Sequence, residues 1–129
     1  MSQPLIFVTS HAIDDGAADT IRELGHRFAE KVASHDTGLL AFHFHLDEEA
    51  GEVTNVQVHR DAASMDAYLP LAEPEIREAL AVTRTVSVDV FGTPGPLLRE
   101  VLRHNEQMGA RVRVRPDHLA GFTREATPA

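Results

Sequence analysis

The sequence contains no cysteine and no tryptophan in its 129 residues. Without cysteine, the chain can form no disulfide bond, no catalytic thiolate and no zinc site with sulfur ligands. Because it has only one Tyr and six Phe, we expect a core built mainly from aliphatic side chains and Phe. No apolar run approaches the roughly 20 residues that cross a bilayer, so the sequence predicts no membrane span.

Basic residues are also in short supply. Lys and Arg number 12 against 20 Asp and Glu, which gives a formal net charge of −8. A protein with this charge does not attract a phosphate backbone, so nucleic acid is not an expected partner. Residues 1–8 contain no basic stretch followed by a long apolar run. We therefore expect no signal peptide, and the predicted location is the cytoplasm.

Apolar periodicity divides the chain into strands and helices. With 43% apolar residues, a chain of this length suits one domain with a single core. Alternation with period two predicts strands, and apolar steps of three and four predict helices. The predicted strands cover residues 5–13, 39–46, 53–59, 85–91 and 111–115, and the predicted helices cover residues 17–34, 62–70, 74–82 and 96–108.

Four residues mark predicted helix ends. Asp15 and Asp61 are placed to cap the helices that follow them, because a short acidic side chain accepts hydrogen bonds from first-turn N–H groups. Pro70 is expected to end or kink a helix, and Pro74 then suits the first turn of a second helical piece.

The predicted element order is β-α-β-β-α-β, followed by a helix and a strand. The first six elements predict an α+β, ferredoxin-like domain, in which both helices cover one face of a four-stranded antiparallel sheet. Residues 1–92 are predicted to form this domain. Residues 93–129 are predicted to form a C-terminal extension that packs on the same domain or on a partner subunit, with residues 125–129 disordered.

The alternation also assigns side chains to the two faces of the predicted sheet. The face predicted to lie under the helices carries aliphatic side chains and Phe: Ile6, Val8, Leu40, Phe42, Phe44, Val56, Val58, Val86, Val88 and Val90. The opposite face is predicted to carry a mixed set: Phe7, Thr9, His11, Ala41, His43, His45, Asn55, Gln57, His59, Ser87, Asp89 and Phe91. Since no helix remains to cover the mixed face, we expect a homodimer in which two such faces enclose a cavity for a small molecule.

The mixed face is the predicted site, and its histidines allow three interpretations. They are interior groups hydrogen-bonded to neighbouring amides and water, or they act in ligand binding or catalysis without a metal, or they hold a divalent metal. The candidate metal ligands are His43, His45 and His59. In the catalytic interpretation, His43 or His59 is the general base, because imidazole titrates near neutral pH, and Asn55 and Gln57 hold the substrate oxygen. Further ligand contacts are expected from His11, His45, Gln57 and Asp89.

A row of arginines near the C-terminus has two interpretations. Arg111, Arg113 and Arg115 alternate with valines. They form either the charged outer side of an edge strand or an anion site, and the pattern alone favours the edge strand.

The run Val56–Met65, VQVHRDAASM, and the element order over residues 5–91 resemble the dimeric α/β-barrel superfamily, in particular its antibiotic-biosynthesis-monooxygenase-like members. The resemblance implies a cofactor-independent or metal-assisted monooxygenase that acts on a small aromatic or polyketide-like molecule in a barrel cavity. In the cofactor-free case, the deprotonated substrate itself donates an electron to O₂. The alternative is a non-catalytic homodimer that binds a small ligand or regulates, and fold analogy alone does not decide whether the protein is an enzyme.

Overall fold

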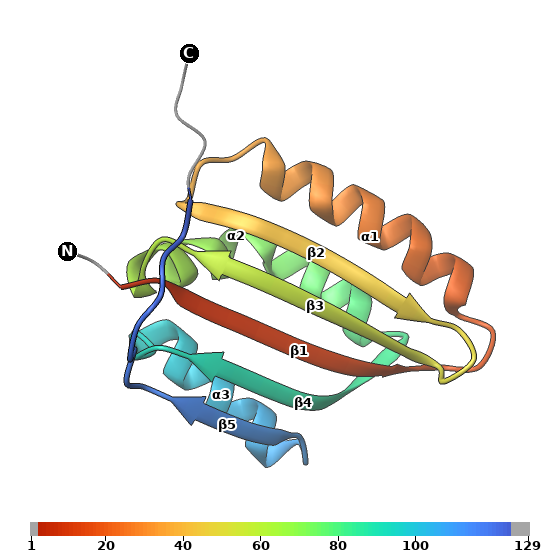
Figure 1. Cartoon of the computed structure of the whole chain (residues 1–129). Helices are drawn as coiled ribbons and strands as arrows, with labels where there is room; N and C mark the ends of the chain where they lie inside the picture. Colours follow the sequence, from red (N-terminus) through yellow and green to blue (C-terminus); the bar gives the residue numbers. More distant parts are fainter. Residues whose placement is uncertain (1–2, 125–129) are drawn as a thin grey trace.

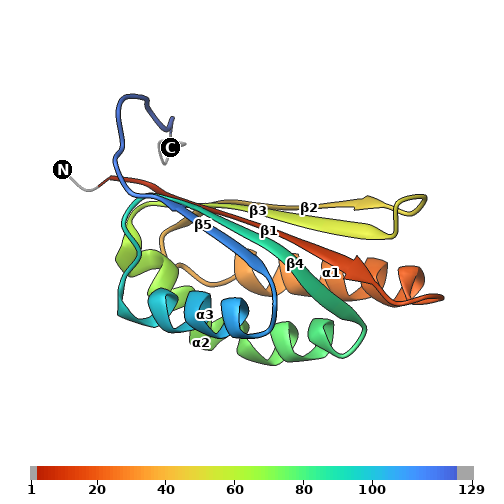
Figure 2. The same cartoon turned by 90° about the horizontal axis from the view of Figure 1, so that it is seen from below.

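A computed structural model describes residues 3–124 of the chain. Five strands form one sheet, and all three helices lie on the same face of it (Figure 1; Figure 2). The elements are β1 (Leu5–Ile13), α1 (Ala18–Ala33), β2 (Leu39–Asp47), β3 (Glu52–His59), α2 (Ala62–Leu80), β4 (Thr83–Phe91), α3 (Pro96–Gln107) and β5 (Arg111–Arg115). No helix in this part of the chain is long and apolar enough to cross a membrane. The predicted disorder of residues 125–129 lies outside the described residues.

The strands follow the order β2-β3-β1-β4-β5 across the sheet. The β1–β3, β1–β4 and β2–β3 pairs are antiparallel, whereas β5 adds to β4 in parallel. A parallel neighbour requires a crossover connection, which α3 supplies. The predicted ferredoxin-like βαββαβ order with a helix and strand added is therefore confirmed, and the arginine-rich β5 is an edge strand.

The apolar spacing of α1 gives the helix its buried stripe. The residues that it buries against the sheet lie three and four apart, as predicted: Ile21, Leu24, Phe28 and Val32. The predicted cap, however, is wrong, because the N-cap residue is Ala17 and no side chain caps this end. Gly16 takes a positive φ of +80°, so the chain turns between Asp15 and the helix.

The second predicted helix is one continuous element. α2 passes through Pro70 and Pro74, so the predicted break between two helical pieces is wrong. Both prolines are exposed, and water can therefore hydrate the carbonyls that lose an N–H partner. Met65 and Ala72 hold the inner side of the helix in the core with no exposed surface. At the start of α2, Asp61 accepts a hydrogen bond from the Ser64 N–H at 2.8 Å, which confirms this cap.

The C-terminal helix contributes to the same core as the ferredoxin-like elements. Leu98 and Leu102 of α3 are buried in one cluster with Met65 and Val90. The helix has no capping side chain of its own at Gly95. Instead, the Asp66 carboxylate of α2 accepts hydrogen bonds from the N–H groups of Leu97 and Leu98, at 3.2 and 3.1 Å.

The register of the sheet overturns part of the predicted face assignment. Gln57 pairs with Phe42 and Asn55 pairs with Phe44, so these polar residues share the helix-covered face with the phenylalanines. On β1, Phe7 pairs with Gln57, and Phe7 and Thr9 are buried, whereas Ile6 and Val8 lie on the open face. The alternation on β1 and β3 was predicted correctly, but its phase is the reverse of the prediction. On β4 the predicted alternation is wrong near its start, because a register shift opposite Ser10 and His11 pairs Thr85 with His11 on the helix-covered face and leaves Val86 exposed. A shift of one residue in the pairing moves every side chain of a strand to the other face.

Candidate functional site

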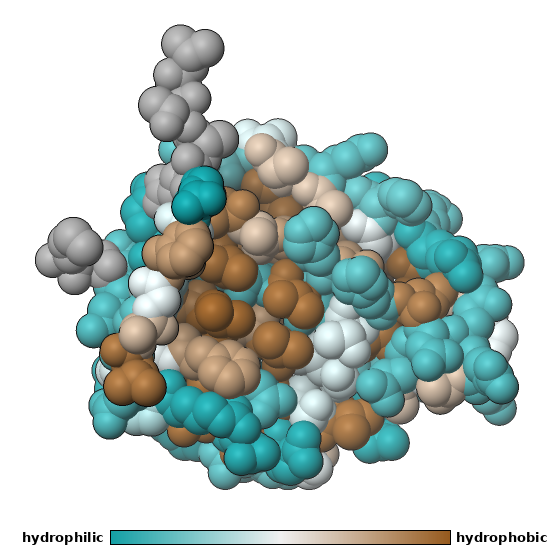
Figure 3. All heavy atoms as spheres, in the orientation of Figure 1, coloured by the Kyte–Doolittle hydropathy of each residue, from teal (hydrophilic) through white to brown (hydrophobic). Residues whose placement is uncertain are grey.

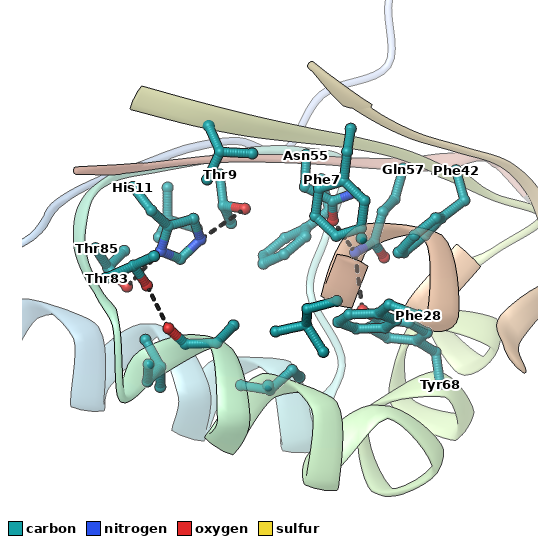
Figure 4. Close-up of a pocket in the computed structure, with 18 of the residues that line it drawn as sticks. Phe7, Thr9, His11, Phe28, Phe42, Asn55, Gln57, Tyr68, Thr83 and Thr85 are labelled. Carbon is teal, nitrogen blue, oxygen red and sulfur yellow. Dashed lines mark hydrogen bonds between the residues drawn. The ribbon is translucent and has the colours of Figure 1, made fainter. Parts of the chain in front are cut away.

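A cavity of about 1000 Å³ lies between the sheet and the helices. The helices line it with aliphatic side chains, among them Ile21, Leu24 and Ile76. Polar side chains of β1, β3 and β4 line the opposite wall, and Figure 4 shows them reaching from the sheet toward the helices. A concave, mainly apolar space with a few converging polar groups is the usual form of a small-molecule site.

The orientations of the buried amides follow from one backbone acceptor. Nδ2 of Asn55 lies 3.1 Å from the carbonyl oxygen of His43, which can only accept. The amide oxygen of Asn55 therefore faces Gln57, whose Nε2 donates to it at 2.5 Å. Oε1 of Gln57 must then accept from Nε2 of His59 at 2.8 Å. These bonds leave each amide one orientation and place the hydrogen of the His59 ring on Nε2.

His59 is buried beneath α2 and has no exposed surface. Its Nδ1 accepts a hydrogen bond from the Ser64 hydroxyl at 3.0 Å, so both ring nitrogens have partners. Burial lowers the pKa of His59 to about 4, although the Asp61 carboxylate opposes this shift. Among the described residues, His59 is not one of those that line the cavity. His59 is thus a neutral group that holds the Gln57 amide in place.

Tyr68 of α2 joins this amide chain at the cavity. Its hydroxyl accepts a second hydrogen bond from Nε2 of Gln57, at 3.1 Å. Burial raises the pKa of Tyr68, and the Gln57 hydrogen bond only partly opposes this, so the phenol stays protonated. Within residues 3–124, neither the Tyr68 hydroxyl proton nor the second Asn55 N–H has an acceptor. Both residues line the cavity, so both donors are available to a ligand oxygen.

His11 lies on the same wall between two threonine hydroxyls. Its Nε2 is 3.2 Å from Oγ1 of Thr9, and its Nδ1 is 3.1 Å from Oγ1 of Thr85 (Figure 4). Burial lowers the pKa of His11 to about 4, so the ring is neutral at neutral pH, with one nitrogen donating and the other accepting. Thr9 pairs with Asn55 across β1 and β3, so the imidazole and the amides are neighbouring parts of one polar wall.

The structure divides the predicted site residues between the two faces of the sheet. His11, Asn55, Gln57 and His59 are on the helix-covered face, three of them lining the cavity. His43 and His45 are exposed on the open face, as the register of β2 requires. Asp89 is also on the open face, where its carboxylate pairs with Arg115 at 3.3 Å.

This division corrects two predictions. The convergence of the His43, His59 and Asn55 side chains in one pocket is wrong. His43 borders the cavity, where its carbonyl accepts from Asn55, but the register places its side chain on the open face. The three candidate metal ligands His43, His45 and His59 are separated in the same way. No group of three or more His, Asp or Glu side chains in residues 3–124 is arranged to hold a metal ion.

The open face is apolar at its centre. Figure 3, in the orientation of Figure 1, shows hydrophobic side chains gathered over the middle of the sheet and hydrophilic ones around them. The register places on this face the residues Ile6, Val8, Ala41, Val56, Val58 and Phe91, which we call the open-face patch. The sequence prediction assigned the mixed polar face to this position.

Comparison with known proteins identifies the fold. No protein-family model matches the chain, and no curated protein matches its sequence. The structure of MupZ from Pseudomonas fluorescens matches with a TM-score of 0.72 at 17% identity, over 99% of this chain and 100% of that one. SnoaB, a cofactor-independent oxygenase from Streptomyces nogalater, matches with a TM-score of 0.60 at 17% identity, over 74% of this chain and 98% of that one.

A third structure, described as an antibiotic biosynthesis monooxygenase, matches with a TM-score of 0.60 at 18% identity, over 70% of this chain and 99% of that one. At these identities the matches establish the fold alone. The chain therefore has the fold of antibiotic-biosynthesis-monooxygenase-like proteins, and the predicted resemblance is confirmed at this level. The MupZ match extends over α3 and β5, because it covers nearly the whole chain.

Proposed function

We propose that the protein is a cofactor-independent monooxygenase that binds a small aromatic or polyketide-like molecule in the cavity between sheet and helices. The observation that supports this most is the pair of unused donors, the Tyr68 hydroxyl and the second Asn55 N–H, at the wall of an otherwise largely apolar space. Two donors without protein acceptors suit a carbonyl oxygen, and they suit its enolate more strongly. The fold shared with SnoaB, a cofactor-independent oxygenase, agrees with this assignment.

The proposed chemistry begins with the loss of a proton from an enol or phenol. His11 is the base, because its ring is neutral and lies on the same wall as Asn55. An anion formed beside His11 raises the pKa of the imidazole, so the base strengthens as the substrate ionises. The base proposed from the sequence, His43 or His59, is replaced by His11 because His43 is exposed on the other face and both His59 nitrogens are occupied.

The deprotonated substrate then supplies the electrons that reduce O₂. For a methylene conjugated with the enolate, the balanced change is CH₂ + O₂ → C=O + H₂O. One oxygen atom enters the new carbonyl, and the other leaves as water with the two hydrogens of the methylene. All four electrons come from the substrate, so no external reductant is required. Asn55 and Tyr68 hold the negative charge on the substrate oxygen during the first electron transfer.

The open-face patch supports a homodimer in this proposal. A monomer would leave these apolar side chains facing water, whereas a second copy packed on the same face buries both patches. The cavity of each chain lies between the sheet and the helices, on the opposite side of the sheet from this patch. Two sheets that meet at this patch place one cavity on each outer side of the barrel.

The proposal is tested with 9-anthrone, an enolisable aromatic ketone whose oxidation to anthraquinone is followed by absorbance. With EDTA-treated protein in air-saturated buffer, we expect oxidation above the buffer rate. Replacing Asn55 with Ala or His11 with Ala lowers kcat/KM by about 10²-fold, and Tyr68→Phe lowers it by about tenfold or more. The control variant His43→Ala keeps the wild-type rate. Loss of activity in His43→Ala with retention in His11→Ala would reject the residue assignment, and wild-type protein no faster than buffer would reject oxidation of this ketone class.

One observation favours binding without catalysis as the second candidate. A pKa of about 4 makes free His11 a weak base, and both of its nitrogens already have threonine partners. In that case 9-anthrone binds to the cavity with an affinity that falls in Asn55→Ala and Tyr68→Phe, but no anthraquinone forms above the buffer rate. Calorimetry and the absorbance assay on the same samples separate the two functions.

A further inference from the structure

We propose that the segment Pro116–Arg124, called the arm, is a dimerisation arm that packs against a second copy of the chain. Every residue of the arm is exposed. It carries two large apolar side chains, Leu119 and Phe122, whose exposed fractions are 96% and 81%. Single exposed apolar residues are common, but two on a short segment that has almost no contact with the rest of the chain indicate a partner.

The base of the arm is fixed to the sheet. The Gly92 N–H donates to the carbonyl of Arg115 at 2.8 Å, and the Thr93 hydroxyl donates to the carbonyl of Pro116 at 3.5 Å. These bonds hold the start of the arm beside the end of β4. Further along, the Arg124 guanidinium lies 5.1 Å from the centre of the Phe122 ring, a contact within the arm itself.

The direction of the arm indicates which surface it can contact. Figure 2 shows that it projects from the open side of the sheet, away from the layer of helices. A segment of nine residues spans up to roughly 30 Å when extended, which is comparable with the width of a small domain. A second copy seated on the open-face patch therefore comes within reach of the arm.

The arm does not cover its own sheet. Exposed fractions of 96% and 81% leave Leu119 and Phe122 almost no contact within the chain. The open-face patch and the arm are thus two unpartnered apolar surfaces on the same side of one molecule. A two-fold dimer buries both surfaces, because the two patches pack against each other and each arm packs against the side of the partner subunit. A second copy of the chain is sufficient to cover both surfaces.

The inference concerns assembly and rests on the proposed homodimer, not on the proposed chemistry. Its first test is sedimentation equilibrium of the full chain and of the double variant Leu119→Ser/Phe122→Ser. Because both side chains contact little within the chain, the variant is expected to fold normally, which circular dichroism checks. The matched control is Met108→Ser, since Met108 is 71% exposed and lies outside the arm, at the end of α3.

We expect the dimer dissociation constant to rise about tenfold or more in the arm variant and to stay unchanged in the control. A dissociation constant unaffected by the arm variant, or a wild-type chain that is monomeric throughout, overturns the proposal. The 9-anthrone assay on the same samples distinguishes the two proposals. If the arm has no role in dimerisation, the wild-type chain can still oxidise 9-anthrone.

A second experiment asks whether the contact is between chains. The absence of native cysteine allows one spin label at Phe122→Cys, mixed with unlabelled ¹⁵N-enriched chains. Any relaxation enhancement then arises between subunits. We expect it along the edge of the open face and not with a label at Met108→Cys. Enhancement of equal size from both labels, or none from the label at Phe122→Cys, would contradict the proposed contact between the arm and the partner subunit.

Discussion

At the scale of single residues, His59 combines complete burial with a neutral imidazole. Its hydrogen bonds to Gln57 and Ser64 require the neutral ring with hydrogen on Nε2. A protonated ring would add a hydrogen at Nδ1, where the Ser64 hydroxyl now donates. The same neutral state fixes the Gln57 amide and, through it, the donors that Asn55 and Tyr68 present to the cavity.

The neutral ring predicts how stability depends on pH. The pKa of His59 is about 4 in the folded protein and near 6.5 when unfolded, so between these values the unfolded chain binds more protons. The free energy of unfolding is therefore highest above pH 6.5 and falls as the pH drops toward 4, by about 3 kcal/mol from this residue. His11, whose pKa burial also lowers to about 4, adds to the fall.

Urea denaturation at several pH values between 7.5 and 4 measures this dependence. In His59→Gln, which removes the titrating group, the curve is expected to be shallower over this interval even if the variant is less stable at pH 7.5. The matched control for a histidine-to-glutamine replacement is His26→Gln, because His26 is exposed on α1. Parallel curves for the wild type and His59→Gln would contradict the assigned titration.

Some of these residues could be recognised from the sequence and others could not. Asn55, Gln57 and His11 stood out because polar side chains alternate with aliphatic ones on predicted strands. Tyr68 could not be recognised, because its helical spacing is that of a residue in the apolar stripe of α2. The role of its hydroxyl follows only from its hydrogen bond to Gln57, which the sequence does not show. His43 has the same pattern as Asn55, and only the pairing register separates their faces.

At the scale of elements, α3 begins with a cap borrowed from another helix. Asp66 of α2 accepts from two N–H groups of the first turn of α3, and its negative charge lies at the positive end of the α3 dipole. Gly95 leaves the space for this contact, because a Cβ there would lie 2.5 Å from Oδ2 of Asp66. The carboxylate thereby ties the C-terminal helix to the ferredoxin-like elements.

Removing this carboxylate is expected to destabilise the fold. Asp66→Ala leaves two N–H groups without their acceptors and lowers the free energy of unfolding by about 1–2 kcal/mol. Asp66→Asn keeps an acceptor but loses the charge, so about half of that loss is expected. Urea denaturation measures both, with Asp19→Ala as the control, because Asp19 is exposed in the first turn of α1, an end that no side chain caps. An Asp66→Ala variant as stable as the control would show that the cap contributes nothing.

The sequence was sufficient for the order of these elements and insufficient for their phase. Periodicity located the strands and α1 because each has a clear apolar repeat. The phases of β1 and β3 were ambiguous, since each strand has aliphatic side chains on one face and a mixed set on the other. Periodicity alone does not say which of the two faces the helices cover. The continuity of α2 through Pro70 and Pro74 depends on packing against the core, which local sequence rules do not include.

At the scale of the whole molecule, the sheet separates two environments. On one side, the helices enclose a cavity whose polar wall carries His11, Asn55 and Gln57. On the other side lies the open-face patch, from which the arm projects (Figure 2; Figure 3). This division assigns ligand chemistry to the helix side and association to the open side, and it is the central claim of the proposed function.

The most direct test of this division is chemical-shift mapping of the ¹⁵N-labelled protein with 9-anthrone. The side-chain amides of Asn55 and Gln57 and the backbone amides of Thr9 and His11 are expected to shift in a saturable manner. Amides around the open-face patch are expected to stay within the error of a solvent-only titration. Saturable shifts confined to the patch, with the Asn55 and Gln57 signals unmoved, would contradict the claim that the ligand site lies between the sheet and the helices.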